Sequence, residues 1–231
     1  MTTVVTAFQG FSPELPQFLA DLRENNSREW FQAHRERYEA VLMQPARAFV
    51  MAMAEPLKAR FGPDVHAEPK VHGSILAINR DTRFSPDKTP YKSHLDLWFW
   101  QGHGPGLSRE RPGYFFRLTP ESLILGAGMH AFSAEAALAA YRRAVLDETL
   151  GPRLEHLAHY LDIRGRTYKR VPAGLPADHP RASWLCHTGL FAQVEQPLLA
   201  ALYTPRFPEF CLDTFSTMVP LQQWLIDALP G

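Results

Sequence analysis

Residues 114–128 read Tyr-Phe-Phe-Arg-Leu-Thr-Pro-Glu-Ser-Leu-Ile-Leu-Gly-Ala-Gly, two apolar runs on either side of a short polar segment. In the first run Tyr114, Phe116 and Leu118 alternate with Phe115 and Arg117, the period-two pattern of a strand whose faces differ. The segment Thr119-Pro120-Glu121-Ser122 is composed of residues that favour turns. Together these features predict a β-hairpin.

Two further short strands are expected upstream of this hairpin. Residues 75–78 form an apolar run, and Leu95, Leu97 and Phe99 alternate with Asp96, Trp98 and Trp100. Four strands with short links and no helix between them favour an antiparallel sheet over a doubly wound one. The strand face that carries Asp96 and the two tryptophans would be a partner or ligand surface if it is open.

Helical patterns flank the sheet on both sides. One helix is expected to begin at Ser12-Pro13-Glu14, a second after Asn25-Asn26-Ser27, and a third near Pro45 that ends at Phe61-Gly62-Pro63. Further helices are expected from Ser133, from about Arg153, and as one element over 207–229. We therefore expect one α+β domain over residues 1–231, with a mainly antiparallel sheet of about four or more strands packed with N- and C-terminal helices. Its parts are a helical region (12–62), the sheet (71–130), and helices with a long basic loop (133–231).

The composition is that of an ordinary globular protein, with 45% hydrophobic and 21% charged residues, which excludes disordered, collagen-like and coiled-coil chains. The 24 basic residues balance the 24 acidic ones, so a nucleic-acid partner is disfavoured, although a local basic stripe would suffice for one. No apolar run approaches the roughly 18 residues of a membrane span, and two distant cysteines are typical of reduced thiols. A cytoplasmic protein without a membrane partner is expected.

Residues 80–92 read Arg-Asp-Thr-Arg-Phe-Ser-Pro-Asp-Lys-Thr-Pro-Tyr-Lys and form the most unusual segment. Its cations are Arg80, Arg83, Lys88 and Lys92, and its acids are Asp81 and Asp87. Pro86 and Pro90 restrict the backbone, which reduces the entropy lost when the loop is ordered. A stiff loop with forked guanidinium groups is suited to hold a phosphate or a carboxylate.

A second basic cluster, Arg164-Gly165-Arg166-Thr167-Tyr168-Lys169-Arg170, opens a long segment rich in Pro and Gly. If the segment 164–180 folds over 80–92, the two would form one site for an anionic small molecule. The candidate ligand-binding residues are Arg80, Arg83, Lys88, Lys92, Tyr168, Lys169 and Arg170. If the same site is catalytic, Asp81, Asp178 and His179 are the candidate acid–base residues.

Two other interpretations of the 80–92 segment stay open beside anion binding. In the first, the same site is the active site of an enzyme. In the second, the chain is a structural or protein-interaction module, and ion pairs within the loop only stabilise the loop. The residues do not identify a cofactor, which stays unknown, and no metal site is expected, because His156-x-x-His159 is only a pair of potential ligands. Gly126-x-Gly128 lacks the third glycine of a dinucleotide-binding motif and predicts a bulge or a close backbone approach.

The thirteen residues from Arg80 to Lys92 resemble the signature of a widespread uncharacterised family, number 2461 among the domains of unknown function. Three other motifs are similar to those of the family: Asn25-Asn26-x-x-x-Trp30-Phe31, Gly126-x-Gly128-Met129, and Tyr168-Lys169-Arg170-x-Pro172-x-Gly174 with Asp178-His179-Pro180. The resemblance runs from about Phe8 to the C-terminus. It implies a single α+β domain and brings with it no established activity, cofactor or catalytic residue.

Overall fold

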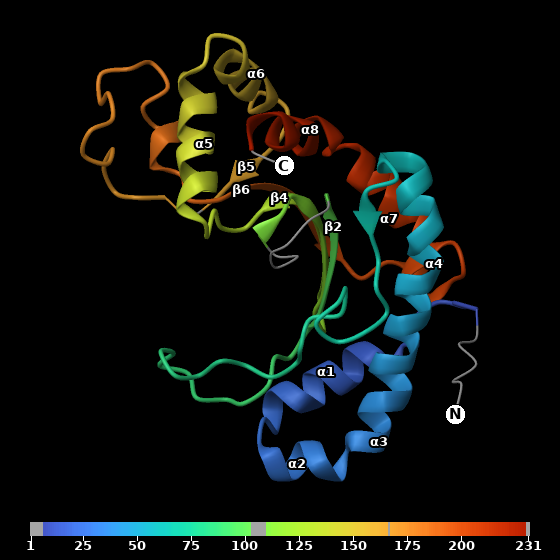
Figure 1. Cartoon of the computed structure of the whole chain (residues 1–231). Coiled ribbons are helices and arrows are strands. Elements are labelled where there is room, and N and C mark those ends of the chain that lie inside the picture. The colour runs from blue at the N-terminus through green and yellow to red at the C-terminus, as the bar shows by residue number, and fades with distance from the viewer. Residues whose placement is uncertain (1–6, 103–109, 166, 230–231) are drawn as a thin grey trace. The chain divides into compact units, whose positions relative to one another are not determined.

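The computed structural model describes residues 7–102, 110–165 and 167–229 (Figure 1). Its helices are α1 (Glu14–Glu24), α2 (Arg28–Ala33), α3 (Arg35–Tyr38), the π-helical turn η1 (Glu39–Met43), α4 (Gln44–Phe61), α5 (Glu135–Leu146), α6 (Leu150–Leu157), the 3₁₀ turns η3 (Trp184–Cys186) and η4 (Ala200–Tyr203), α7 (Phe207–Ser216) and α8 (Val219–Ala228). Its strands are β1 (Val65–His66), β2 (Leu95–Gln101), β3 (Gly113–Leu118), β4 (Ser122–Met129), β5 (Ile163–Arg164) and β6 (Leu190–Pro197). No helix in these ranges is long and apolar enough to cross a membrane.

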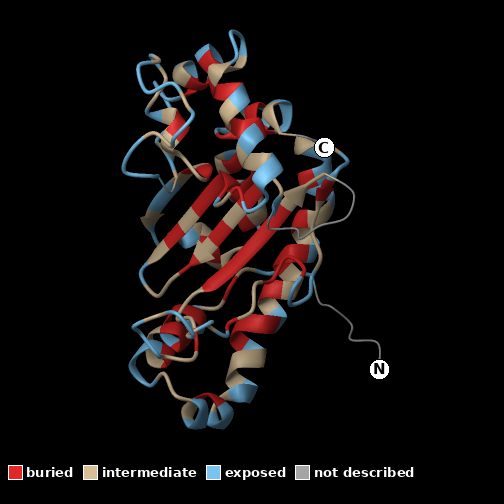
Figure 2. Cartoon of the chain, turned by 60° about the vertical axis from the view of Figure 1, so that its left-hand side comes forward, coloured by how far each residue is buried: buried red, intermediate tan, exposed pale blue. Residues whose placement is uncertain are grey.

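The strands form a six-stranded antiparallel sheet in the order β1-β2-β3-β4-β6-β5, which confirms the α+β class and the antiparallel sheet. The β3–β4 hairpin is also confirmed. In its turn Thr119 N–H donates to the Ser122 carbonyl at 2.9 Å, and Ser122 N–H donates to Thr119 Oγ1 at 2.8 Å. Buried residues run along the strands, as Figure 2 shows.

Several elements differ from the sequence-based expectation. Residues 75–78 form no named strand; Ile75 makes two isolated bridges, antiparallel to Leu97 and parallel to Val71. Strands β1, β5 and β6 were not foreseen, and they lie outside the expected sheet region 71–130. The expected helix over 207–229 is two helices, and Pro220 lies in the first turn of α8, where its fixed φ favours a helix start.

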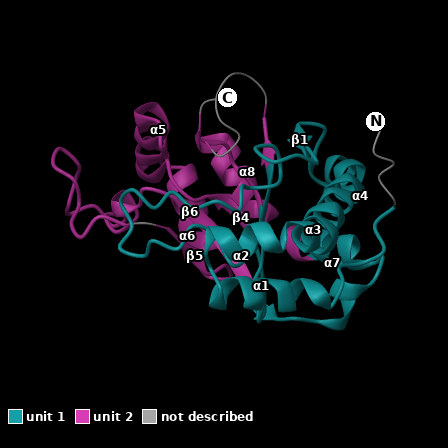
Figure 3. Cartoon of the chain, turned by 90° about the horizontal axis from the view of Figure 1, so that it is seen from below, with its two compact units in different colours: residues 1–99, 115–125, 195–213 teal, residues 100–114, 126–194, 214–231 magenta. Residues whose placement is uncertain are grey.

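The chain forms two compact units, which are coloured separately in Figure 3. The first comprises residues 1–99, 115–125 and 195–213, and the second 100–114, 126–194 and 214–231. The expectation of a single domain stays a prediction.

Four phenylalanine rings form the centre of the first unit. They are Phe11, Phe49 on α4, Phe116 on β3 and Phe207 on α7. All pairs among them have ring centroids 5.4–6.1 Å apart, within the range of favourable aromatic contacts. This aromatic cluster packs the N-terminal segment and α4 against the inner face of β3.

In the second unit α5 packs against α6 and α8. The Tyr141 hydroxyl donates to the Trp184 carbonyl at 2.8 Å, and the Trp224 indole N–H donates to the Leu150 carbonyl at 2.8 Å. Gly128 has a φ of +136°, and a Cβ there would lie 2.3 Å from the Leu190 carbonyl oxygen. The close backbone approach that the sequence predicts at this glycine is thereby confirmed.

The base of the 80–92 loop is fixed to the N-terminal helices of the first unit. Arg80 N–H donates to the Pro90 carbonyl at 2.9 Å, and Lys92 N–H donates to the Ile78 carbonyl at 2.8 Å, so the two ends of the loop run antiparallel. The Asn26 amide, just before α2, accepts from Tyr91 N–H at 3.0 Å and donates to the Tyr91 carbonyl at 2.9 Å. The Tyr91 ring stacks on Phe31 of α2 at 4.2 Å.

Replacing Asn26 by Ala leaves the Tyr91 N–H and carbonyl groups without these partners. Unpaired backbone groups away from water cost about 1–3 kcal/mol, and we expect Asn26→Ala to lower the free energy of unfolding in urea by that amount. The neighbouring Asn25→Ala is the control, because its amide donates only to an exposed helix-end carbonyl, that of Asp21. An equal loss in both variants would contradict the proposed anchoring by Asn26.

Candidate functional site

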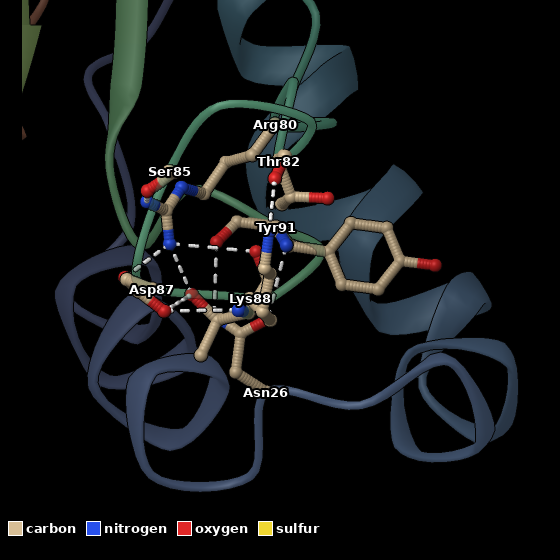
Figure 4. Close-up of polar contacts among 8 residues, drawn as sticks. Asn26, Arg80, Thr82, Ser85, Asp87, Lys88 and Tyr91 are labelled. Carbon is tan, nitrogen blue, oxygen red and sulfur yellow. Dashed lines mark hydrogen bonds and ion pairs between the residues drawn. The ribbon is translucent and has the colours of Figure 1, made fainter.

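The Arg80 guanidinium is the centre of the 80–92 loop (Figure 4). Its Nη1 donates to the Asp87 carboxylate and to the Thr89 hydroxyl, and its Nη2 lies 3.4 Å from Ser85 Oγ. Asp87 Oδ1 also accepts from the N–H and the hydroxyl of Thr89 at 2.9 and 2.8 Å. The bonds from Thr89, followed by the one from Arg80, lower the pKa of Asp87 to about 2. Arg80 therefore holds the loop together, and an external anion would have to compete with Asp87.

Arg83 and Asp81 form a second pair, on the exposed side of the same loop. Arg83 Nε and Nη2 donate to the two carboxylate oxygens at 2.9 and 2.7 Å, a bidentate arrangement that lowers the pKa of Asp81 to about 2. A carboxyl with this pKa is ionised at neutral pH and is unsuited to donate a proton. Lys88 Nζ donates to the Thr82 carbonyl at 2.9 Å and has no carboxylate partner among the described residues.

A different set of basic side chains surrounds Asp96 on β2. The carboxylate is 3% exposed and lies within five successive buried residues, 95–99. Arg117 of β3 donates to it through Nε at 2.7 Å and Nη2 at 3.1 Å. His94 Nε2 and Lys92 Nζ lie 3.2 and 3.5 Å from the same Oδ2 that Nη2 contacts. Lys92, His94, Arg117 and Asp96 are called the Asp96 cluster below.

The charges in the Asp96 cluster do not cancel. Burial by itself would raise the pKa of the Asp96 carboxyl, but the hydrogen bonds and charges of His94 and Arg117 outweigh burial, so the pKa lies below its ordinary value. The carboxylate is therefore ionised. Within the cluster, two permanent cations against one carboxylate leave one excess positive charge.

Part of the Asp96 cluster faces water. The side chains of Lys92, His94 and Arg117 are 23%, 24% and 35% exposed. Neither Nη1 of Arg117 nor Nδ1 of His94 has a hydrogen-bond partner among the residues that the structure describes. The Arg117 guanidinium lies 5.2 Å from the Phe115 ring centroid, so an apolar surface adjoins the polar one. Such a set of donors is suited to the oxygen atoms of a phosphate or a carboxylate.

The other predicted site residues lie in the second unit. Arg164 pairs with Asp162 at 2.5 Å, and the Tyr168 N–H donates to the Cys186 carbonyl at 2.8 Å. Lys169 and Arg170 are exposed and form no ion pair with a described residue; Arg166 lies outside the described residues.

Asp178 and His179, the other acid–base candidates, also lie in the second unit. Asp178 is exposed, and His179 Nδ1 accepts from Arg181 N–H at 3.1 Å. Because the segments 80–92 and 164–180 belong to different units, a joint site formed by them stays a prediction.

Three members of the Asp96 cluster were not among the candidate site residues, namely His94, Asp96 and Arg117. The signal for two of them lies in the sequence, because Lys92, His94 and Asp96 occupy every second position before and within a strand. Arg117 alternates in the same way in the next strand, but its pairing with Asp96 depends on the register of β3 against β2.

Comparison with known proteins identifies a family. The family described as conserved hypothetical protein (DUF2461) matches residues 14–224. No curated protein and no solved structure matches the chain. Among the described residues, no three His, Cys, Asp or Glu side chains gather closely enough to hold a metal ion.

The Asp96→Asn variant tests whether the buried carboxylate holds the cluster together. Removing one partner of a buried ion pair costs about 3–5 kcal/mol, and we expect about 3 kcal/mol at pH 7, because Arg117 remains in contact with water. The pKa of Asp96 lies below the 3.8 of an ordinary Asp carboxyl, so its charge stabilises the fold above about pH 4. That contribution is lost as the pH falls through the folded-state pKa. In urea unfolding curves, the difference in free energy of unfolding between wild type and Asp96→Asn should therefore become smaller as the pH falls below about 4. A difference that does not change with pH would refute the stabilising role of the Asp96 charge.

The two arginines of the loop give a matched pair of variants. Arg80→Lys keeps the charge but removes the fork that bonds Asp87, Thr89 and Ser85. Hydrogen bonds to charged groups contribute about 1.5–3 kcal/mol, so amide hydrogen exchange over residues 81–89 should accelerate about tenfold or more. Arg83→Lys should leave that exchange nearly unchanged, since its pair with Asp81 is fully exposed. If exchange over residues 81–89 accelerates in Arg83→Lys and not in Arg80→Lys, then Arg83 rather than Arg80 holds the loop together.

Proposed function

This chain belongs to the DUF2461 family, and we propose that it binds an anionic small molecule, one that bears a phosphate or a carboxylate, at the Asp96 cluster. The observation that carries the proposal is the convergence of Lys92, His94 and Arg117 on a single oxygen of Asp96. Asp96 orients the three basic groups, and their charge exceeds its own. The predicted ligand class is thus retained, while the centre of the proposed site moves from the loop tip to the end of the loop at Lys92.

The strength of the proposed interaction follows from the excess charge. One cation in excess within the cluster, at about 4 Å from an anion, contributes about 4 kcal/mol at an effective dielectric constant near 20, before the cost of removing water. Of the four contacts to Asp96, that of Lys92 is the longest, at 3.5 Å, and the Lys92 side chain is 23% exposed. We therefore propose Lys92 Nζ and Arg117 Nη1 as the donors to a bound oxyanion.

An enzyme at the same cluster is the second candidate, and one observation favours it. His94 lies in contact with a buried carboxylate, as general acid–base histidines commonly do, and its second ring nitrogen is unpartnered among the described residues. Conversion of a bound ligand that stops in His94→Gln, with ligand binding retained, would establish catalysis. Unaltered ligands throughout would leave a binding protein.

Thermal unfolding with a panel of inorganic phosphate, nucleotides, sugar phosphates and carboxylic acids tests the proposed function. A ligand present at 100 times its Kd adds about 2.7 kcal/mol, which raises the Tm of a chain of this size by about 5–10 °C. We expect Lys92→Gln to remove most of this shift, because one of the two permanent cations is lost.

Two control variants locate the site. Lys58→Gln changes an exposed lysine on α4 and should leave the ligand-induced Tm shift intact. Lys88→Gln should also leave it intact. Loss of the Tm shift in Lys88→Gln but not in Lys92→Gln would place the anion at the loop tip. The absence of a Tm shift with every member of the panel would contradict the proposed function.

A further inference from the structure

The Phe84 side chain is 92% exposed, whereas the next most exposed large hydrophobic residue among those described, Tyr160, is 54% exposed. An aromatic ring in water gives up the free energy that burial would supply. Isolated exposed apolar residues are common on protein surfaces, but a nearly bare phenylalanine at the tip of a loop that is cross-linked by hydrogen bonds is not explained by the fold. The residues on either side of Phe84 are engaged in contacts within the loop.

The loop tip, residues 81–88, is held by bonds on both sides of Phe84. Lys88 follows Phe84 in the chain and donates to the carbonyl of Thr82, which precedes it, whereas the fully exposed Arg83–Asp81 pair adds little restraint. Arg80 then joins Asp87 to the base of the loop. Because these contacts already restrict the loop tip, little further conformational entropy is lost when it binds a partner. All of these residues belong to the first unit.

The charges around Phe84 indicate the chemistry of what it contacts. Asp81 is neutralised by Arg83, and Asp87 by Arg80, whereas Lys88 contacts a carbonyl. The Arg83 guanidinium lies 5.8 Å from the Phe84 ring centroid and is itself 77% exposed. The tip therefore presents an aromatic ring with a net positive rim. One exposed ring and one lysine without a carboxylate partner among the described residues supply too little apolar area and charge to hold a protein at a bilayer, which argues against a lipid surface.

We infer that the loop tip is a docking element that inserts Phe84 into an apolar pocket of another protein, with carboxylates at the pocket rim opposite Arg83 and Lys88. An aromatic anchor beside a guanidinium is the composition typical of interface hot spots, where a central ring is buried and charged groups surround it. The inference does not depend on the Asp96 cluster, since Phe84 makes no contact with it among the described interactions.

Site-specific photo-crosslinking in the cells that naturally produce the protein tests this inference. Phe84→p-benzoylphenylalanine in the full chain should give one discrete adduct with another protein, at an apolar residue that has Asp or Glu neighbours. The same substitution at Met51, which is 47% exposed on α4, is the control and should not give that adduct. An adduct with a second copy of this chain or with lipid, or the absence of a discrete adduct at position 84, would overturn the inference.

The identified partner is then purified and its affinity for the chain is measured. Phe84→Ala should weaken binding about 30-fold or more, the fold-change expected of a hot spot, without changing the Tm, whereas Met51→Ala should leave affinity unchanged. Lys88→Glu should weaken binding about tenfold, and exchange of the opposing carboxylate for Lys should restore it. An affinity for the partner that is the same in Phe84→Ala as in the wild type would overturn the inference. Lys92→Gln should not alter this affinity, so a failure here is distinguishable from a failure of anion binding.

Discussion

A charge buried in a sheet is the constraint on which the site depends. Asp96 lies on β2 where both of its neighbours are buried, and an isolated carboxylate there would be strongly unfavourable. It is tolerated because Arg117 supplies a bidentate partner from β3 and because the chain entering β2 brings His94 and Lys92 to the same oxygen. One carboxylate thereby orients three basic side chains and ties the end of the 80–92 loop to the sheet.

The 80–92 segment divides into parts with different physical roles. Arg80, Asp87 and Thr89 satisfy one another inside the loop, and Tyr91 joins it to Asn26 and Phe31 of the N-terminal region. Lys92 leaves the loop and joins the Asp96 cluster. Phe84 projects from the loop, and among the described residues its side chain contacts only the adjacent guanidinium of Arg83. A motif that is one basic segment in the sequence therefore has four separate parts in the structure. One part stabilises the loop internally, one attaches it to the N-terminal region, one contributes a cation to the Asp96 cluster, and one is an exposed aromatic ring.

This division relates the two proposals to each other. Ion pairing inside the loop, which counts against Arg80 and Arg83 as ligands for an external anion, is also what holds Phe84 in a defined position. The positive charge that remains is divided between Lys88 at the tip and the Asp96 cluster at the end of the loop. The proposed small-molecule site and the proposed docking element thus consist of separate residues, Lys92 in the first and Phe84 in the second.

The sequence by itself determined the α+β class, the hairpin with its turn, and the close backbone approach at Gly128, because alternation, turn residues and glycine spacing act over a few neighbouring residues. The boundaries of the 80–92 segment were likewise clear from its prolines and charges. Only the tertiary structure decided which carboxylate pairs with which cation. Arg117 meets Asp96 through the register of two strands, and Asn26 meets Tyr91 across 65 positions of the chain. Such pairings depend on the path of the whole backbone, which no local pattern of residues specifies.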